Sequence, residues 1–200
     1  MVGKGGNHVK CALCDNKECY KGKDCTGVGD EVMREYRSGE LKTLRVSTDI
    51  ESEFYMKKTR LEELIIYAKE MDFKRLGIAF CIGLEREAKI INGILSKYFE
   101  VCSVCCKICG IDKSTFDLKR LHGNWDKEAM CNPIGQARVL NEKETDLNVI
   151  LGLCVGHDTL FTKYSKAPVT TLAVKDRVLG HNPLAVIYSD YYLKERFSVR

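Results

Sequence analysis

Eleven cysteines are present among the 200 residues, and most of them fall in two groups. The first group is a C-x2-C-x4-C-x5-C array made of Cys11, Cys14, Cys19 and Cys25. The second is a run in the middle of the chain that contains Cys102, Cys105, Cys106 and Cys109. An odd number of cysteines fits a disulfide framework poorly, and clustered thiols in an intracellular chain more often bind metal. Thiolate coordination is therefore the first chemistry to consider.

The N-terminal array lies in a segment that is too short and too polar to bury a hydrophobic core. Residues 11–25 read CALCDNKECYKGKDC, so metal coordination would have to supply the folding free energy. The spacing matches neither a zinc ribbon nor a bacterial ferredoxin, which leaves zinc and an iron–sulfur cluster open, and with them a structural or a redox role. Lysines alternate here with Asp15, Glu18 and Asp24, which favours a solvated surface over a nucleic-acid contact.

Residues 148–165, NVILGLCVGHDTLFTKYS, contain a second candidate for chemistry. An apolar run leads into Cys154, Gly156 and His157, and apolar residues then recur at helical spacing. This pattern predicts a buried strand, a glycine turn and the start of a helix. Ligands of open parallel sheets collect where such strands end, so Cys154 and His157 are candidate site residues.

Residues 75–104 predict a strand, a helix and a second strand. The first strand, Arg75–Gly83, ends at a Cys81-x-Gly step, and the second runs from Phe99 to Val104. A connection of this length makes the two strands parallel and brings their C-terminal ends to one edge of the sheet. A cysteine inside an apolar strand is most often a small buried hydrophobe, and we interpret Cys81 and Cys102 in this way.

The run CSVCCKICG at residues 102–110 permits two geometries. If the strand continues to Cys106, then Cys102 and Cys106 share one face of the sheet and Cys105 takes the other. If the chain turns at Val104, then Cys105, Cys106 and Cys109 lie together in a loop at the ligand edge. The second geometry suits a binding site better.

Two further loops are expected at the same edge. The sequence Cys131-Asn132-Pro133 predicts an N-cap and the start of a helix, a position that lowers the pKa of a thiol and favours the thiolate. A last strand, Val169–Val174, is followed by a loop that contains Asp176, Arg177 and His181. Asp176 and His181 could serve as base or ligand, although their use as turn residues that satisfy backbone groups is the stronger interpretation.

The remaining pattern defines the domain organisation. Residues 26–46 predict a linker with at most a short helix near 30–36, and a Thr48-x-x-Glu51 capping box predicts one long amphipathic helix over 49–71. We expect a cysteine-rich metal knuckle and linker over residues 1–47 and an α/β domain with a cysteine-lined crevice over 48–200. The expected fold is three-layer, Rossmann-like or flavodoxin-like, with a mostly parallel sheet of about four strands.

Composition excludes some classes of function. A net charge of +4 from 32 basic and 28 acidic residues is too mild to argue for a nucleic-acid or membrane partner. No apolar stretch is long enough to span a bilayer, and the opening MVGKGGNHVKC lacks the hydrophobic core of a signal peptide. We therefore expect a cytoplasmic chain.

Five motifs resemble those of a known family, and the resemblance extends over nearly the whole chain, the N-terminal cysteine array included. They are KRLGIAFCIGL, SVCCK, AMCNPIGQARVLN, TDLNVILGLCVGHDTLF and APVTTLAVKDRVLGHNP. The chain resembles an uncharacterised cysteine-rich family of anaerobic bacteria and archaea, catalogued as a domain of unknown function and described as metal-binding. The resemblance implies metal binding at Cys11, Cys14, Cys19 and Cys25. It names no reaction, so function has to be argued from the site.

The sequence thus predicts a metal-binding protein with two thiolate sites that hold zinc or an iron–sulfur cluster, with redox or electron-transfer work if iron is present. The ligands expected in the crevice are Cys105, Cys106, Cys109, Cys131 and Cys154, and its rim is formed by His157, Asp176, Arg177 and His181. One alternative is an enzyme with Cys131 or Cys154 as nucleophile and His157 or His181 as base. Another is a metal sensor or carrier. The metalloprotein and the enzyme would each act with a redox partner or on a small-molecule substrate.

Overall fold

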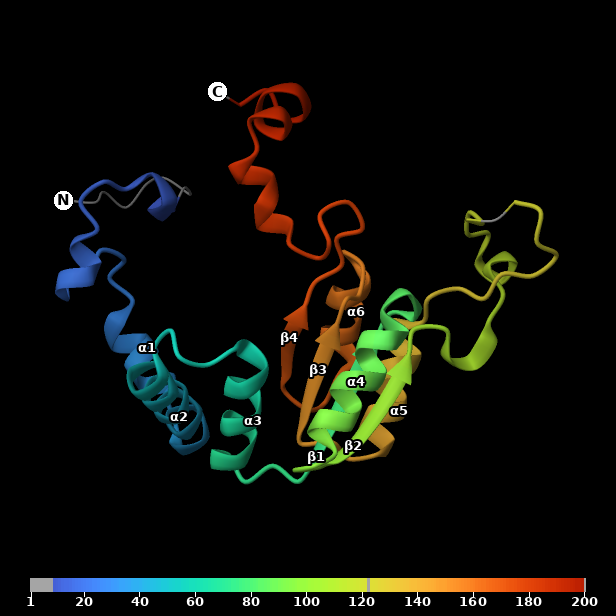
Figure 1. Cartoon of the computed structure of the whole chain (residues 1–200). Coiled ribbons are helices and arrows are strands. Elements are labelled where there is room, and N and C mark those ends of the chain that lie inside the picture. The colour runs from blue at the N-terminus through green and yellow to red at the C-terminus, as the bar shows by residue number, and fades with distance from the viewer. Residues whose placement is uncertain (1–8, 122, 200) are drawn as a thin grey trace. The chain divides into compact units, whose positions relative to one another are not determined.

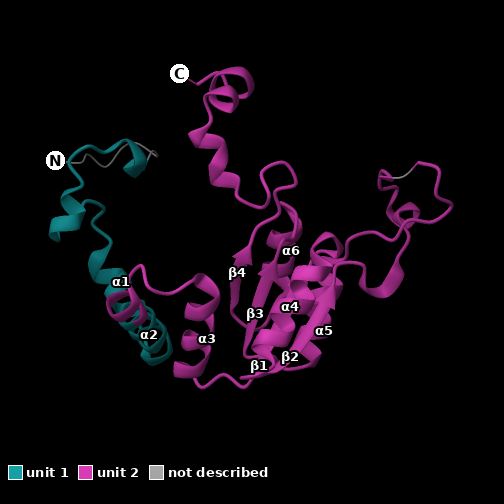
Figure 2. Ribbon diagram, viewed as in Figure 1, with its two compact units in different colours: residues 1–49 teal, residues 50–200 magenta. Residues whose placement is uncertain are grey.

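The computed structural model describes residues 9–121 and 123–199 (Figure 1). Two compact units divide the chain, Met1–Asp49 and Ile50–Arg200 (Figure 2). The expectation about a signal peptide concerns residues 1–11, of which the first eight lie outside the described part. Within that part, every helix is too short or too polar to cross a membrane.

The first unit carries the cysteine array on a segment without a core. Two short 3-10 turns, Cys11–Leu13 and Glu18–Lys21, precede helix α1 (Gly29–Glu35), and helix α2 (Ser38–Phe54) begins in this unit. Every residue from 9 to 28 is exposed, as the polar sequence predicts. The carboxylate of Asp24 accepts the backbone N–H groups of residues 26, 27 and 29, which fixes the chain where α1 starts.

The second unit is built on a sheet of four parallel strands. The strands are β1 (Arg75–Phe80), β2 (Glu100–Cys105), β3 (Leu147–Leu151) and β4 (Val169–Ala173), in the order β2-β1-β3-β4 (Figure 1). This confirms the predicted α/β fold. The chain moves outward from β1 to β2 and then returns to the other side of β1. The strand order therefore reverses between β1 and β3, which is the switch point where this class of fold binds ligands.

Helices cover both faces of the sheet and complete three layers. On one face, α3 (Arg60–Glu70) and α4 (Glu85–Leu95) contribute Leu64, Ala68, Ala88 and Leu95 to a core with alternate residues of β1 and β3. On the other face, α5 (Pro133–Glu142) and α6 (His157–Tyr164) contribute Ala137, Leu140 and Phe161 to a second core. The two-residue alternation of the strands assigns each side chain to one of these cores.

The expected long helix over 49–71 is wrong. Helices α2 and α3 are separate, and Met56 between them adopts a left-handed backbone with φ +56°. The capping box forms at Thr59 and Glu62, whereas Thr48 lies inside α2 and its hydroxyl donates to the carbonyl of Leu44. The Thr-x-x-Glu pattern occurs twice in this region, and the second copy starts a helix.

The Asn182-Pro183 step predicts that one final helix begins at Pro183, and this prediction is wrong. Two short helical turns form instead, Pro183–Tyr188 and Tyr192–Arg196. Neither turn contributes a buried residue. Without a face that packs on a core, an extended helix gains little from tertiary contacts.

A close contact between β1 and β3 requires glycine at position 77. Gly77 pairs with Asn148, whose fully buried amide accepts from the Thr145 hydroxyl and donates to the Ser165 hydroxyl, both at 2.8 Å. A Cβ on residue 77 would lie 2.0 Å from the Oδ1 of Asn148. The polar network thus occupies the space that a side chain would need.

We predict that Gly77→Ala lowers the free energy of unfolding by about 2–4 kcal/mol, because the added methyl group displaces a buried, hydrogen-bonded amide. Urea unfolding monitored by circular dichroism measures this change. Gly93→Ala is the matched control, since Gly93 lies in α4 with open space around it and alanine should be neutral or stabilise by up to about 1 kcal/mol. Equal stability of the two variants would contradict the prediction.

Candidate thiolate site

The backbone of Cys106 joins three elements at the C-terminal edge of the sheet. Phe80 pairs with Cys105, and the N–H of Cys106 then donates to the carbonyl of Phe80 at 2.9 Å. On its other side, the carbonyl of Cys106 accepts the N–H of Asn132 at 2.7 Å. Cys106 therefore lies between Cys81, which follows Phe80, and Cys131, which precedes Asn132. We call Cys81, Cys106 and Cys131 the thiol row.

Contacts between residues 111–113 and 128–130 join the two ends of the segment that connects Cys106 to Cys131. Lys113 forms an ion pair with the carboxylate of the buried Glu128 at 2.6 Å, and its backbone N–H donates to the Glu128 carbonyl at 3.0 Å. The N–H of Met130 donates to the carbonyl of Ile111 at 2.8 Å. These contacts bring the two ends together, so that Cys131 arrives beside Cys106 at the start of α5.

Of the two geometries that the sequence permits for residues 102–110, the first is present. The strand continues through Cys105, and Cys102 and Cys106 both pack in the core beside α5 and α6. Our preference for a turn at Val104 is wrong, because pairing with β1 extends to Cys106. The thiol of Cys105 accepts from the backbone N–H of Lys107 at 3.5 Å, and Cys109 is exposed with φ +71°. Neither residue belongs to the row.

Hydrogen bonding and burial shift the pKa values of the three thiols in opposite directions. Hydrogen bonds to Cys131 and Cys81, together with burial, raise the pKa of Cys106, which is 2% exposed. The Cys106 thiol in turn lowers the pKa of Cys81 and of Cys131, because its single S–H can donate to either sulfur. The backbone N–H of Gly83 adds to the effect at Cys81. The row thus combines a protonated central thiol with two outer sulfurs that favour the thiolate form.

Three cations surround the row. The amine of Lys107 lies 3.6 Å from the Cys131 sulfur, and Lys175 lowers the pKa of Cys81. The guanidinium of Arg177 donates to the Cys154 sulfur at 3.1 Å. Among residues 9–121 and 123–199, none of these cations is paired with a carboxylate. Lys107 and Arg177 instead contact cysteine sulfurs, and Lys107 also donates to the carbonyl of Ala129, an environment typical of reactive or metal-binding cysteines.

The lysine that follows β4 lies beside two glycines. A Cβ on Gly83 would lie 3.5 Å from the amine of Lys175, and a Cβ on Gly152 would lie 3.6 Å from its Cε. The Lys175 side chain therefore passes against the loops that follow β1 and β3. This places its charge at the switch point.

Cys154 and His157 belong to the same region. The carbonyl of Cys154 accepts the N–H groups of His157 and Asp158, which starts α6 directly after the cysteine. Besides its hydrogen bond to Cys154, Arg177 interacts electrostatically with Cys81 and Cys131. His157 contributes to lowering the pKa of Cys131. The structure thus brings together Cys106, Cys131, Cys154, His157 and Arg177 from the set that the sequence predicted.

Asp176 and His181 form hydrogen bonds within their own loop. The backbone N–H of Asp176 donates to Nδ1 of His181 at 3.1 Å, and its carboxylate accepts from the N–H groups of Val178 and Leu179. His181 has φ +67°. These contacts agree with the interpretation of both residues as turn residues.

The cysteines do not form a ready-made coordination shell. Cys11, Cys14, Cys19 and Cys25 are free and exposed, and all other cysteines are free as well. In the described part of the chain, no three Cys, His, Asp or Glu side chains surround a common point as a bound metal ion requires. The thiol row is held by hydrogen bonds instead.

Sequence reasoning missed four residues of the site: Cys81, Lys107, Gln136 and Lys175. The fully buried Gln136 donates from Nε2 to the carbonyls of Phe80 and Val104, at 3.1 and 2.7 Å, and so ties together the ends of β1 and β2. Its Oε1 has no partner among the described residues. A polar residue on the apolar face of α5, between Pro133 and Leu140, was the available signal.

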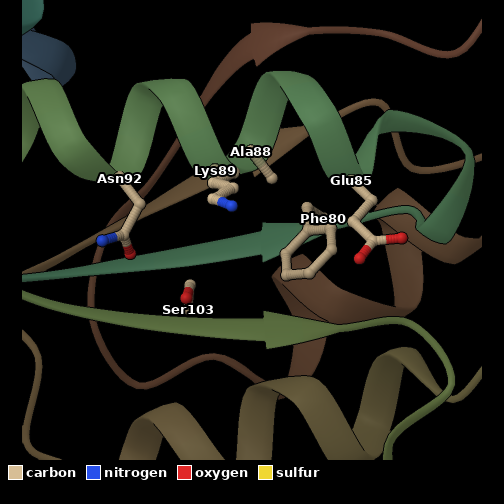
Figure 3. Close-up of a pocket in the computed structure, with 6 residues that line it drawn as sticks. All are labelled: Phe80, Glu85, Ala88, Lys89, Asn92 and Ser103. Carbon is tan, nitrogen blue, oxygen red and sulfur yellow. The ribbon is translucent and has the colours of Figure 1, made fainter.

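A groove of about 350 Å³ lies on the opposite face of β1 and β2, beneath α4 (Figure 3). Its lining consists of Phe80, Glu85, Ala88, Lys89, Asn92 and Ser103. Phe80 and Ser103 face this groove because side chains alternate along a strand, whereas Cys81 and Cys106 face α5. The groove is therefore separate from the thiol row and contains no metal-binding cysteine or histidine.

Fold and site define a doubly wound parallel α/β protein with a cluster of cysteines at the C-terminal edge of its sheet. The chain belongs to the family described as "Protein of unknown function (DUF1847)", which it matches over residues 20–172. It is 60% identical over 189 residues to "Uncharacterized protein MJ0455" of Methanocaldococcus jannaschii, an alignment that covers 94% of this chain and 97% of that protein. No solved structure matches. The family predicted from the motifs is confirmed, and its description assigns no function.

We predict that iodoacetamide alkylates Cys131 of the metal-free protein well below pH 8, where an ordinary thiol is mostly protonated. Cys106→Ala should move the rate–pH profile of Cys131 upward by roughly one pH unit or more, because the sulfur loses its hydrogen-bond donor. Peptide mass spectrometry after timed labelling measures each cysteine separately. The control Cys102→Ala removes a thiol from the same core and should leave the Cys131 profile unchanged. An unaltered profile in Cys106→Ala would show that the row is not coupled.

Proposed function

We propose that this chain is a thiolate metalloprotein whose thiol row binds zinc or an iron–sulfur cluster, with redox or electron-transfer work if iron is bound. One observation carries most of the argument. Three sulfur donors from three separate elements meet at the C-terminal edge of the parallel sheet, beside the switch point at which such folds bind their ligands. Cys154, which Arg177 connects to the row electrostatically, is the candidate for a fourth ligand.

The donors fit a thiophilic metal in kind. Zinc and iron–sulfur clusters both prefer cysteine sulfur, and two members of the row favour the thiolate form that binds metal. Lys107, Lys175 and Arg177 would offset the negative charge of a metal–thiolate centre, and the N–H of Ile82 already donates to the Cys106 sulfur at 3.4 Å. An iron–sulfur cluster would supply one-electron transfer there, whereas zinc would supply a structural link or a Lewis acid.

Metal binding would replace the hydrogen bonds of the row with coordination. Cys106 holds its proton between two sulfurs, and a thiol has to lose its proton to become a ligand. Binding at the row should therefore release this proton, and affinity should rise with pH.

The N-terminal array would form the second site, with Cys11, Cys14, Cys19 and Cys25 as ligands. Its whole segment is exposed, so coordination is the natural source of its folding free energy. Either a structural zinc or a redox cluster suits four thiolates. Eleven free thiols also favour a reducing compartment, and we place the protein in the cytoplasm with a redox partner or a small-molecule substrate.

Anaerobic purification of the full chain, followed by measurement of zinc, iron and acid-labile sulfide, tests the proposal. Cys106→Ser should lose the metal of the row and keep that of the array, whereas the double variant Cys14→Ser, Cys19→Ser should do the reverse. Cys102→Ser is the matched control, because this thiol packs beside the row without belonging to it. The proposal fails if wild-type protein takes up neither zinc nor iron with sulfide under anaerobic reconstitution.

A second candidate function rests on the position of Cys131. This half-buried sulfur lies directly before α5, whose N-cap Asn132 accepts from the N–H of Gly135 at 2.8 Å, and Lys107 lies beside it. Cys131 would then act as a nucleophile with His157 as the base. Such an enzyme keeps Cys131 alkylatable in metal-loaded protein, whereas coordination protects it. A metal sensor or carrier would instead exchange its metal without turnover.

A further inference from the structure

We propose that the thiol row is also a thiol–disulfide relay, in which Cys106 forms a disulfide with Cys131 or with Cys81 and transfers the disulfide between them. This activity goes beyond the proposed metal binding and does not rest on it. A disulfide within the row and a metal ion on the same sulfurs exclude each other. The two states would be alternative uses of one set of thiols.

The strand register places Cys81 and Cys106 within reach of a disulfide. These residues directly follow the paired Phe80 and Cys105, and neighbouring parallel strands lie about 5 Å apart. A disulfide spans Cα separations of roughly 4.4–6.8 Å. Both side chains pack in the core beside α5, so they point to the same face of the sheet. The N–H of Ile82 donates to the Cys106 sulfur at 3.4 Å, which places this sulfur against the turn that follows Cys81.

Cys131 approaches Cys106 from the other side. The hydrogen bond of 2.7 Å from Asn132 to the carbonyl of Cys106 makes the two segments backbone neighbours. The amine of Lys107, the residue after Cys106, lies 3.6 Å from the Cys131 sulfur. The Cys106 sulfur can thus reach two partners, and because a sulfur forms one disulfide at a time, oxidation has to select between them.

Burial sets the direction of the relay. Cys131 is partly exposed, whereas Cys81 and Cys106 are 7% and 2% exposed. A disulfide in solution therefore meets Cys131 first. The ammonium group of Lys107 stabilises a thiolate at this position, and the thiolate is the form that attacks disulfides. Cys131 is the entry point, Cys106 the resolving thiol and Cys81 the final partner.

The exchange steps balance with a low-molecular-weight disulfide as oxidant. The Cys131 thiolate attacks one sulfur of the oxidant, forms a mixed disulfide and releases a small thiolate. Cys106 then attacks the Cys131 sulfur, and the second small thiol leaves with the Cys106 proton. Finally, the Cys81 thiolate attacks the Cys106 sulfur, which forms the Cys81–Cys106 disulfide and returns Cys131 as a thiolate. The row loses two electrons and the oxidant gains them.

Oxidised glutathione, added to full-length protein that was isolated anaerobically and dialysed against a chelator, tests the relay. Peptide mass spectrometry should find a protein disulfide that links Cys106 to Cys81 or Cys131. Cys106→Ser should trap glutathione on Cys131, and Cys81→Ser should stop at the Cys106–Cys131 disulfide. Cys131→Ser should slow oxidation of the row by about tenfold or more, because the remaining thiols are buried. Cys102→Ser is the control and should behave like wild type.

Two results would overturn the relay. In one, glutathione stays on Cys131 of the wild-type protein and no protein disulfide forms. In the other, the disulfides that form exclude Cys106. Because Cys81→Ser and Cys106→Ser probe different steps, the loss of one variant to misfolding leaves the other decisive. A protein that binds no metal and still forms these disulfides retains the relay and loses the proposed metal function, so the two failures are distinguishable.

Discussion

The two backbone hydrogen bonds of Cys106 hold the site together. One continues the pairing of β1 with β2 for a residue beyond the strand, and the other attaches the segment before α5 to the same edge of the sheet. Gln136 supports this junction from beneath, because its buried amide donates to the carbonyls at the ends of both strands. Cysteines that are 25 residues apart in sequence, 81 and 106 and then 106 and 131, thereby become neighbours.

Burial of thiolates at this junction has an electrostatic cost, and the structure offsets it with fixed cations. A thiolate inside a protein is stable only beside hydrogen-bond donors or positive charge. Lys107 lies beside Cys131, Lys175 reaches the turn after Cys81, and Arg177 donates to Cys154. These cations come from the segments that follow β2 and β4. Loops on both sides of the switch point therefore contribute to one electrostatic environment, as ligand-binding edges of doubly wound sheets generally do.

Much of the second unit could be predicted from sequence because its signals are local. Apolar runs, glycine turns and the Asn132-Pro133 cap identify the four strands and the start of α5. The position of the break between α2 and α3 could not be predicted from sequence, because Thr48 and Thr59 begin equivalent Thr-x-x-Glu patterns. Only packing decides which of two equivalent local signals starts a helix.

The site was harder to predict because it depends on strand register. The sequence favours a buried hydrophobe at Cys81, and its place in the row becomes visible only when β1 and β2 are paired and Cys106 lies beside it. Cys105 and Cys109 have the residue type that the prediction required, but the Cys105 sulfur accepts from the backbone N–H of Lys107 and Cys109 is exposed in the turn that follows β2. The roles of Asp176 and His181 could be predicted from sequence, because their contacts are local and agree with the interpretation of both as turn residues.

The central claim is that the three thiols of the row act as one unit with the proton on Cys106. Ultraviolet thiolate absorbance of the metal-free full chain near neutral pH, compared between wild type and Cys106→Ala, tests this claim most directly. Cys106 is itself protonated, so independent thiols would show no change when it is removed. The coupled row predicts that the absorbance falls, because Cys81 and Cys131 lose the donor that stabilises their thiolates. An unchanged absorbance would contradict the account.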